Sequence, residues 1–146
     1  MNNTRLSPAN IVIMAGAVVA FLASFFAFYK YSFLGFTKSF NAWSSHFFIM
    51  ATIPALIALA MGVLAAVESF AQNAAIPYRI LGFSLNQVYL VLGFQATIMM
   101  LAWTIVDYVG FNKGIGMYLM LLGAIVCLVG AIMRVAQGAA QTPPTF

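Results

Sequence analysis

The segments FLGFTKSFN (residues 33–41) and YVGFNKGIG (residues 108–116) share one pattern, 75 residues apart in the chain. In each, a glycine follows an aromatic and an aliphatic residue, and a lysine stands three positions after that glycine. Gly35 and Gly110 can adopt backbone conformations barred to other residues, while the lysines suit a boundary between lipid and water. We therefore expect both segments to be interfacial turns that join membrane-spanning helices on the same side of a bilayer.

The overall composition places the chain among integral membrane proteins. Hydrophobic residues make up 64% of it and charged residues 5%, with a mean hydropathy of +1.03, which is far from soluble globular usage. Because a spanning helix needs about 20 residues, the 146 residues can hold four spans with short connections. We expect one transmembrane domain over residues 1–136 and no separate water-soluble domain.

Charges, prolines and turn residues bound four apolar runs. We expect spanning helices over residues 11–29, 44–67, 85–106 and 114–133, and a disordered tail over residues 137–146. Ser84 and Gln87 have the spacing of a capping box before the third run. The runs lack the alternation of barrel strands, and the first is longer than the core of a cleaved signal peptide. The predicted fold is therefore an all-α membrane protein, a compact bundle of four transmembrane helices.

The shared turn pattern also predicts an internal repeat. Each half of the chain would be a helical hairpin, and the two hairpins would be related by an axis along the membrane normal. The alternative is chance, because Gly-Phe also occurs at residues 82–83 and 93–94 in a chain with 14 Phe and 11 Gly.

Small residues recur in threes and fours along three of the four runs. Such stripes let helix backbones approach closely in lipid, so we expect them to face one another inside the bundle. Pro54 lies inside the second run and removes the hydrogen bond to the carbonyl of Met50, which predicts a kink. The helix-packing positions that we assign are Gly16, Ala55, Gly62, Gly116, Gly123 and Gly130.

Groups that could support catalysis or metal binding are sparse. Glu68 and Asp107 are the only acids and would lie at opposite membrane faces, while His46 is the only histidine and Cys127 the only cysteine. A carboxylate pair, a metal site and a catalytic triad are therefore not expected, and we assign no catalytic, metal-binding or cofactor-binding residue. A haem held by His46 and a methionine of the fourth run is the one cofactor arrangement left open.

Gln95 would fall at the middle of the third span, where a side-chain amide needs a partner. We expect it to be buried between helices as a packing contact, with a solute site as the alternative. A pore would need a continuous polar stripe, which the runs do not contain.

The last candidate site is a surface rich in aromatic side chains near the two turns. Such side chains anchor contacts with proteins and with lipid headgroups, although an ordinary interfacial belt has the same composition. The residues that we assign to this surface are Tyr29, Phe33, Phe36, Trp43, His46, Trp103 and Tyr108.

The six basic residues are scattered, which excludes nucleic acid as a partner. The positive-inside rule gives a tie, because each face would carry three of them. The N-terminal amine and the aromatic content of the lysine face favour both termini in the cytoplasm. The basic residues of one face would be Arg5, Arg79 and Arg134, and those of the other face would be Lys30, Lys38 and Lys113.

The segments RLSPAN (residues 5–10), FNAWS (residues 40–44) and NKGIG (residues 112–116) occur in this order. Together they resemble small four-span integral membrane proteins of actinobacteria. The resemblance brings no catalytic residues or cofactor to this chain. It implies a plasma-membrane location, where small spanning subunits accompany respiratory or envelope-building complexes.

Two classes of function follow from these observations. The small-residue stripes, the sparse chemistry and the aromatic surface favour a non-catalytic accessory or scaffold subunit that packs against a larger membrane complex. The repeat and Gln95 support the alternative of a small transport or permeation protein, and lipid binding is a third reading.

Overall fold

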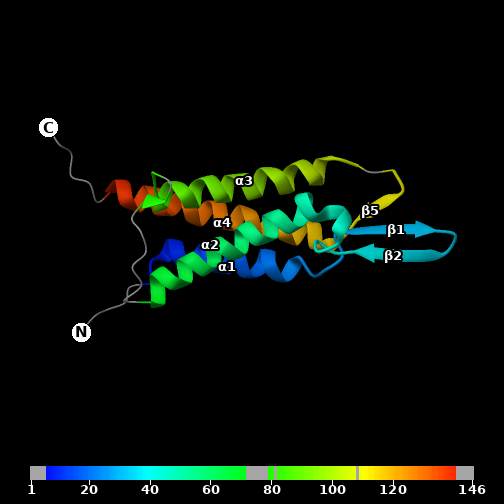
Figure 1. Cartoon of the computed structure of the whole chain (residues 1–146), viewed down its shortest axis with the longest axis horizontal. Coiled ribbons are helices and arrows are strands. Elements are labelled where there is room, and N and C mark those ends of the chain that lie inside the picture. Colours follow the sequence, from blue (N-terminus) through cyan, green and yellow to red (C-terminus); the bar gives the residue numbers. More distant parts are fainter. Residues whose placement is uncertain (1–5, 72–78, 81, 108, 141–146) are drawn as a thin grey trace.

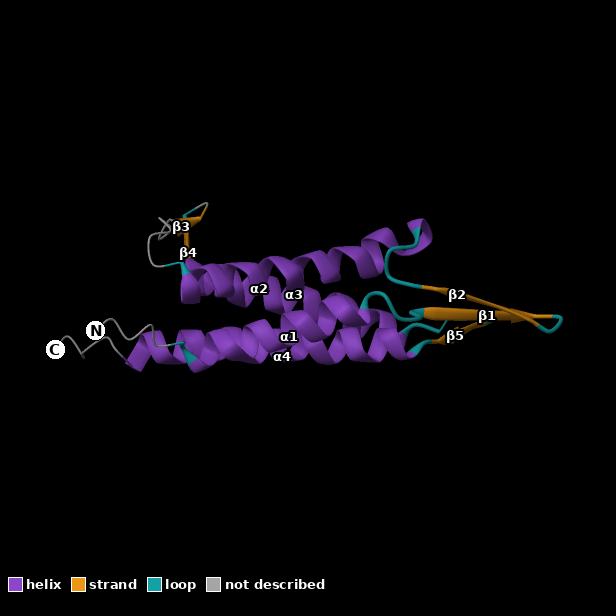
Figure 2. Ribbon diagram, turned by 90° about the horizontal axis from the view of Figure 1, so that it is seen from below, coloured by secondary structure: helices purple, strands orange, loops and turns teal. Residues whose placement is uncertain are grey.

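The computed structural model describes residues 6–71, 79–80, 82–107 and 109–140. Neighbouring helices alternate in direction to form a bundle (Figure 1). Both α2 and α4 pack against α1 and against α3, and α1 and α4 form one layer below α2 and α3 (Figure 2). The four α-helices are α1 (Pro8–Ala23), α2 (Ile53–Phe70), α3 (Leu85–Ile105) and α4 (Ile115–Ala140).

Within the described residues, three helical segments are long and apolar enough to cross a membrane, namely Ser45–Phe70, Leu85–Ile105 and Ile115–Gly138. The fourth helix, α1, is apolar but has only 16 residues. The helices therefore support the membrane class that the composition predicts.

α1 and α4 approach each other closely at the glycines of α4. A Cβ added to Gly130 would lie 3.0 Å from the backbone nitrogen of Ile13, and one added to Gly116 would lie 2.9 Å from the carbonyl oxygen of Ala23. The two helices thus touch backbone to backbone along most of α1. All six positions assigned from the sequence lie at helix contacts or in the core: Gly16, Ala55, Gly62, Gly116, Gly123 and Gly130.

Two predicted helix ends are wrong. α1 ends at Ala23, well before residue 29, because the chain turns and Tyr29 begins a strand. α4 continues to Ala140, so residues 137–140 are helical and only residues 141–146 of the predicted tail lie outside the described residues. The physical reason is that Arg134, expected at the water boundary, is bonded inside the bundle and does not end the helix.

The second span begins irregularly before Pro54, rather than bending at its middle. A 3-10 turn (Ser45–Phe47) and a π-helical turn (Phe48–Thr52) precede α2, whose first turn contains Pro54. The Ile53 N–H bonds to the Phe48 carbonyl oxygen, five residues back, and proline offers no N–H to the next carbonyl. The predicted mid-span kink is therefore a distorted entry to the helix.

A small antiparallel sheet extends beyond the helices at one end of the bundle (Figure 2). Its strand order is β2 (Phe36–Phe40), β1 (Tyr29–Phe33), β5 (Phe111–Lys113). Leu34 and Gly35 form the hairpin turn with φ of 47° and 84°, and both positive values fit a type I′ turn. The all-α prediction is thus incomplete, and residues 33–41 are one tight turn followed by a strand.

The two turns share one backbone feature, although Gly82, of the Gly-Phe pair at residues 82–83, has a φ of 87° as well. Gly35 and Gly110 both have φ of 84°, and the strand after each, β2 or β5, pairs with β1. Among the described residues the second half has no counterpart of β1, and α1 packs more closely on α4 than α2 does on α3. Superposition of the two helical hairpins stays a prediction.

At the opposite end of the bundle, β3 (Arg79–Ile80) pairs with β4 (Phe83–Ser84). The Ser84 hydroxyl accepts a hydrogen bond from the Gln87 N–H at 3.4 Å, and the Gln87 side chain accepts one from the Ser84 N–H at 2.9 Å. The predicted capping box is confirmed.

Candidate functional site

The three-stranded sheet has one aromatic face and one polar face. Directly paired residues of antiparallel strands share a face, and successive residues alternate between faces. The aromatic face therefore holds Tyr29, Tyr31, Phe33, Phe36, Lys38, Phe40, Phe111 and Lys113. The polar face holds Lys30, Ser32, Thr37, Ser39 and Asn112.

The aromatic face is buried at its base and exposed at its tip. Near the helices, Tyr29 is fully buried and its ring stacks on that of Phe47, with centroids 5.1 Å apart. Toward the turn the exposed fraction reaches 58% for Phe33 and 82% for Phe36, and Leu34 in the turn is 81% exposed. The tip of the hairpin thus presents large apolar side chains at the surface.

The strained backbone of Leu34 leads to a first prediction. A leucine at positive φ costs roughly 1 to 2 kcal/mol, whereas asparagine tolerates that conformation. Leu34→Asn is expected to stabilise the hairpin by about 1 kcal/mol, measured as slower hydrogen exchange of the β1 and β2 amides. Thr37→Asn on the polar face is the control and should not slow exchange. Unchanged protection in Leu34→Asn would show that the turn carries no strain.

A pocket of 340 Å³ lies at the base of the aromatic face. One wall comes from the sheet and the other from the irregular entry to the second span, so residues far apart in the sequence meet there. The lining is aromatic or apolar except at His46, which is exposed. The residues that line it are Tyr29, Phe40, His46, Phe47, Met50 and Phe111.

Of the two lysines on the aromatic face, Lys113 is paired with an acid and Lys38 is not. The Lys38 ammonium lies 5.3 Å from the centroid of the Phe40 ring. The chain has two acidic side chains: Asp107 pairs with Lys113 of this same face at 2.5 Å, and Glu68 pairs with Arg134 at the other end of the bundle. Lys38 therefore has no carboxylate partner within the described residues.

The predicted aromatic surface is brought together only in part. Tyr29, Phe33 and Phe36 share the aromatic face, and His46 lies at the rim of its pocket. Trp43 packs instead on the residues that follow α1, because its indole N–H donates to the Ser24 hydroxyl at 2.9 Å and its ring stacks on Phe25. Of the remaining two residues, Trp103 is partly buried near the end of α3 and Tyr108 lies outside the described residues.

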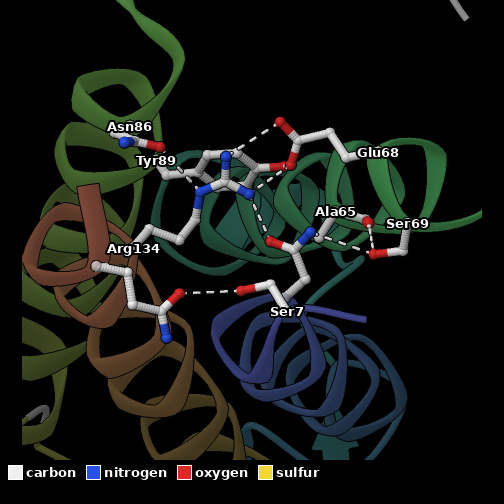
Figure 3. Close-up of polar contacts among 9 residues, drawn as sticks. Ser7, Ala65, Glu68, Ser69, Asn86, Tyr89 and Arg134 are labelled. Atoms are coloured by element: carbon white, nitrogen blue, oxygen red, sulfur yellow. Dashed lines mark hydrogen bonds and ion pairs between the residues drawn. The ribbon is translucent and has the colours of Figure 1, made fainter. Parts of the chain in front are cut away.

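A polar cluster lies at the other end of the bundle (Figure 3). Arg134 of α4 donates to the side-chain oxygens of Asn10 of α1 and, at 3.1 Å, of Asn86 of α3. It also forms an ion pair with Glu68 of α2, donating to Oε1 at 3.1 Å. The Tyr89 hydroxyl donates to Glu68 at 3.2 Å, and Cζ of Arg134 lies 4.4 Å from the centroid of the Tyr89 ring. One side chain thus connects all four helices.

The cluster has the features of a structural contact that holds the four helices together. The Arg134 and Glu68 side chains are only 14% and 15% exposed, and each compensates the charge of the other. In the sequence, these two residues mark the ends of two different spans, and nothing there predicts that they pair. A signal for a polar cluster was present, since polar residues interrupt or bound all four apolar runs near this same end.

The prediction for Gln95 is wrong, because this side chain is exposed. The buried face of α3 carries Tyr89, Gly93, Ala96 and Met100, and Gln95 falls outside that stripe. The Gln95 side chain makes no hydrogen bond to another described residue. The main polar support for a solute path through the bundle is therefore lost.

The remaining candidate groups show no reactive arrangement. Cys127 is fully buried beside the Ile13 carbonyl oxygen, 3.6 Å from it. Among the described residues no group of three or more His, Cys, Asp or Glu side chains lies close enough to hold a metal ion. Comparison with protein-family models, curated proteins and solved structures found no match to this chain.

Proposed function

We propose that this protein is a non-catalytic accessory or scaffold subunit that docks onto a larger membrane complex through the tip of its sheet. The observation that carries the proposal is the exposed tip. Phe33, Leu34 and Phe36 are held away from the bundle, and Leu34 adopts positive φ there. Exposed aromatic side chains on a rigid element are typical anchors of protein interfaces, and backbone strain concentrates where a site must be presented.

The proposed topology is four membrane crossings. α1 spans roughly 24 Å at 1.5 Å per residue, and the described residues that follow it, 24–28, lengthen the crossing. Support comes from its packing along α4, since the added-Cβ contacts of Gly116 and Gly130 reach both ends of α1.

The proposed location is the plasma membrane, with both termini in the cytoplasm and the sheet on the outer side. The support is the resemblance to small actinobacterial membrane proteins, together with the N-terminal amine on the arginine face and the aromatic content of the lysine face. A respiratory or cell-envelope assembly is the partner complex that this setting favours, and the partner surface is the extramembrane part of that complex.

Docking is favoured over catalysis or transport by the disposition of the polar groups. The two acids sit at opposite ends of the bundle in separate ion pairs, and Gln95 faces outward. The two carboxylates are therefore too far apart to act as a pair, and Gln95 gives no support for a polar path through the bundle.

The second prediction tests docking in native membranes. A photo-crosslinking amino acid at Phe36 is expected to join the chain to one defined polypeptide, whereas the same group at Thr37, on the opposite face of the same strand, should not. The double change Phe33→Ser/Phe36→Ser should reduce co-purification of that polypeptide at least roughly thirtyfold, since an interface anchor is worth about 2 kcal/mol or more.

Two outcomes would contradict docking through the tip. One is equal crosslinking from Phe36 and Thr37, and the other is co-purification unchanged in the double variant. Reconstituted chain alone that moved a solute across liposomes would overturn the accessory role itself.

A further inference from the structure

The pocket at the base of the aromatic face lies where the sheet meets the second span. Tyr29, Phe40 and Phe111 form its sheet wall, and Phe47 and Met50 belong to the segment that leads into α2. That segment is part of a span-length apolar helix beginning at residue 45, so the pocket sits at the level of the membrane interface. Its volume of 340 Å³ is within the usual range of small-ligand sites, about 300 to 1,000 Å³.

The wall contributed by the second span has an unusual backbone. Met50 lies in the π-helical turn Phe48–Thr52, a form that is rare and is frequently found at functional sites. The turn is fixed at its end, because the buried Thr52 hydroxyl donates to the carbonyl oxygen of Ala42 at 2.6 Å. The irregular backbone that lines the pocket is thus fixed by a hydrogen bond to another part of the chain.

The rim of the pocket is suited to an anion. Two side chains that can carry positive charge lie near the Phe40 ring: its centroid is 6.1 Å from that of the His46 ring and 5.3 Å from the Lys38 ammonium. Asp107 pairs with Lys113 and Glu68 with Arg134, so neither acidic side chain of the chain neutralises Lys38, and an anion from another molecule can do so. Apolar walls with a cationic rim match an amphiphile with an acidic head.

We propose that this pocket binds one anionic phospholipid from the surrounding bilayer. Part of an acyl chain lies in the pocket against Phe40, Met50 and Phe111, and the phosphate is held at the rim by Lys38 with His46 nearby. This site differs from the proposed docking tip, and neither requires the other.

The test measures lipid retained by the purified full-length chain with native mass spectrometry in mild detergent. Phosphatidylglycerol is expected to bind at one molecule per chain, and phosphatidylcholine with the same acyl chains only weakly. Lys38→Ser should lower the phosphatidylglycerol affinity about tenfold, the effect of losing one charge-assisted contact. Lys30→Ser is the matched control, because it removes the same charge from the polar face of the same sheet, and it should leave the affinity unchanged.

A second variant tests the apolar part of the site. Met50→Trp is expected to fill the pocket and abolish phosphatidylglycerol retention, while the chain still elutes as a single species in detergent. Glycerol 1-phosphate, which has the acidic head without the chains, should bind much more weakly than the lipid. If it bound as tightly, the site would be one for a free phosphate compound and the lipid proposal would be overturned.

Three further results would overturn the proposal. They are equal binding of the two phospholipids, equal losses in Lys38→Ser and Lys30→Ser, and full retention in Met50→Trp. The docking proposal fails separately, because Phe33→Ser/Phe36→Ser is expected to lose the protein partner and to keep the lipid.

Discussion

Gly123→Leu is expected to lower the free energy of unfolding of the bundle by about 3 kcal/mol, the upper end of the usual cost of overpacking. A Cβ added at Gly123 would lie 2.6 Å from the backbone nitrogen of Ala20 and 2.7 Å from its Cβ. Because backbone atoms form this contact, no change of side-chain rotamer can relieve it, and α1 must move away from α4. Thermal unfolding in detergent, followed by circular dichroism, measures the loss.

The neighbouring helix supplies both a second test and a control. An added Cβ at Gly16 would lie 2.7 Å from the backbone nitrogen of Cys127, so Gly16→Leu should destabilise the bundle similarly. Ala15 is exposed, and Ala15→Leu adds a comparable side chain to the outer surface of the same helix. Unfolding temperatures of Gly16→Leu and Gly123→Leu that match Ala15→Leu would show that the α1–α4 contact is not tight.

Glu68→Ala is expected to cost about 3 to 5 kcal/mol, the usual effect of removing one partner of a buried ion pair. Arg134 would keep its two amide acceptors, but its charge would remain uncompensated at 14% exposure. Because Arg134 contacts all four helices, the loss should reduce the stability of the whole bundle in detergent unfolding.

Asp107→Ala is the matched control, since it removes the only other acid of the chain. Asp107 is 87% exposed in its ion pair with Lys113, and exposed pairs contribute only about 0 to 1 kcal/mol. The double change Glu68→Leu/Arg134→Met should recover part of the stability lost in Glu68→Ala, because no unpaired charge is then buried. Equal losses of stability in Glu68→Ala and Asp107→Ala would contradict the role of Arg134 in holding the four helices together.

The position of α1 beside α4 links the bundle to the sheet. Where these helices meet the sheet, the Gly114 N–H bonds to the Phe28 carbonyl oxygen at 2.8 Å, and the Gly116 N–H bonds to that of Ala27 at 2.9 Å. This register brings β5 against β1 and completes the aromatic face. Loss of the α1–α4 contact should therefore also weaken the sheet and its pocket.

Several features were predictable because their causes are local. Apolar composition and run length indicate membrane helices, and α3 begins where the capping box of Ser84 and Gln87 predicts. Gly35 and Gly110 take the positive φ that their turns require. The first strand also had a local signal, since YKYSF alternates aromatic and polar residues with the period of a strand, but its aromatic content suggested an interfacial belt instead.

Composition and local pattern by themselves therefore determined the membrane class, the approximate helices, the capping box and the glycine turns, because each depends on residues close together in the chain. The tertiary structure decided which distant residues meet. Strand pairing places Tyr29 opposite Phe40 and Lys113, helix order joins Arg134 to Glu68, and the rotation of α3 turns Gln95 outward. These arrangements depend on which helix faces pack together, and close backbone contact at glycines selects those faces through interactions between residues more than 100 positions apart, as at Gly16 and Cys127.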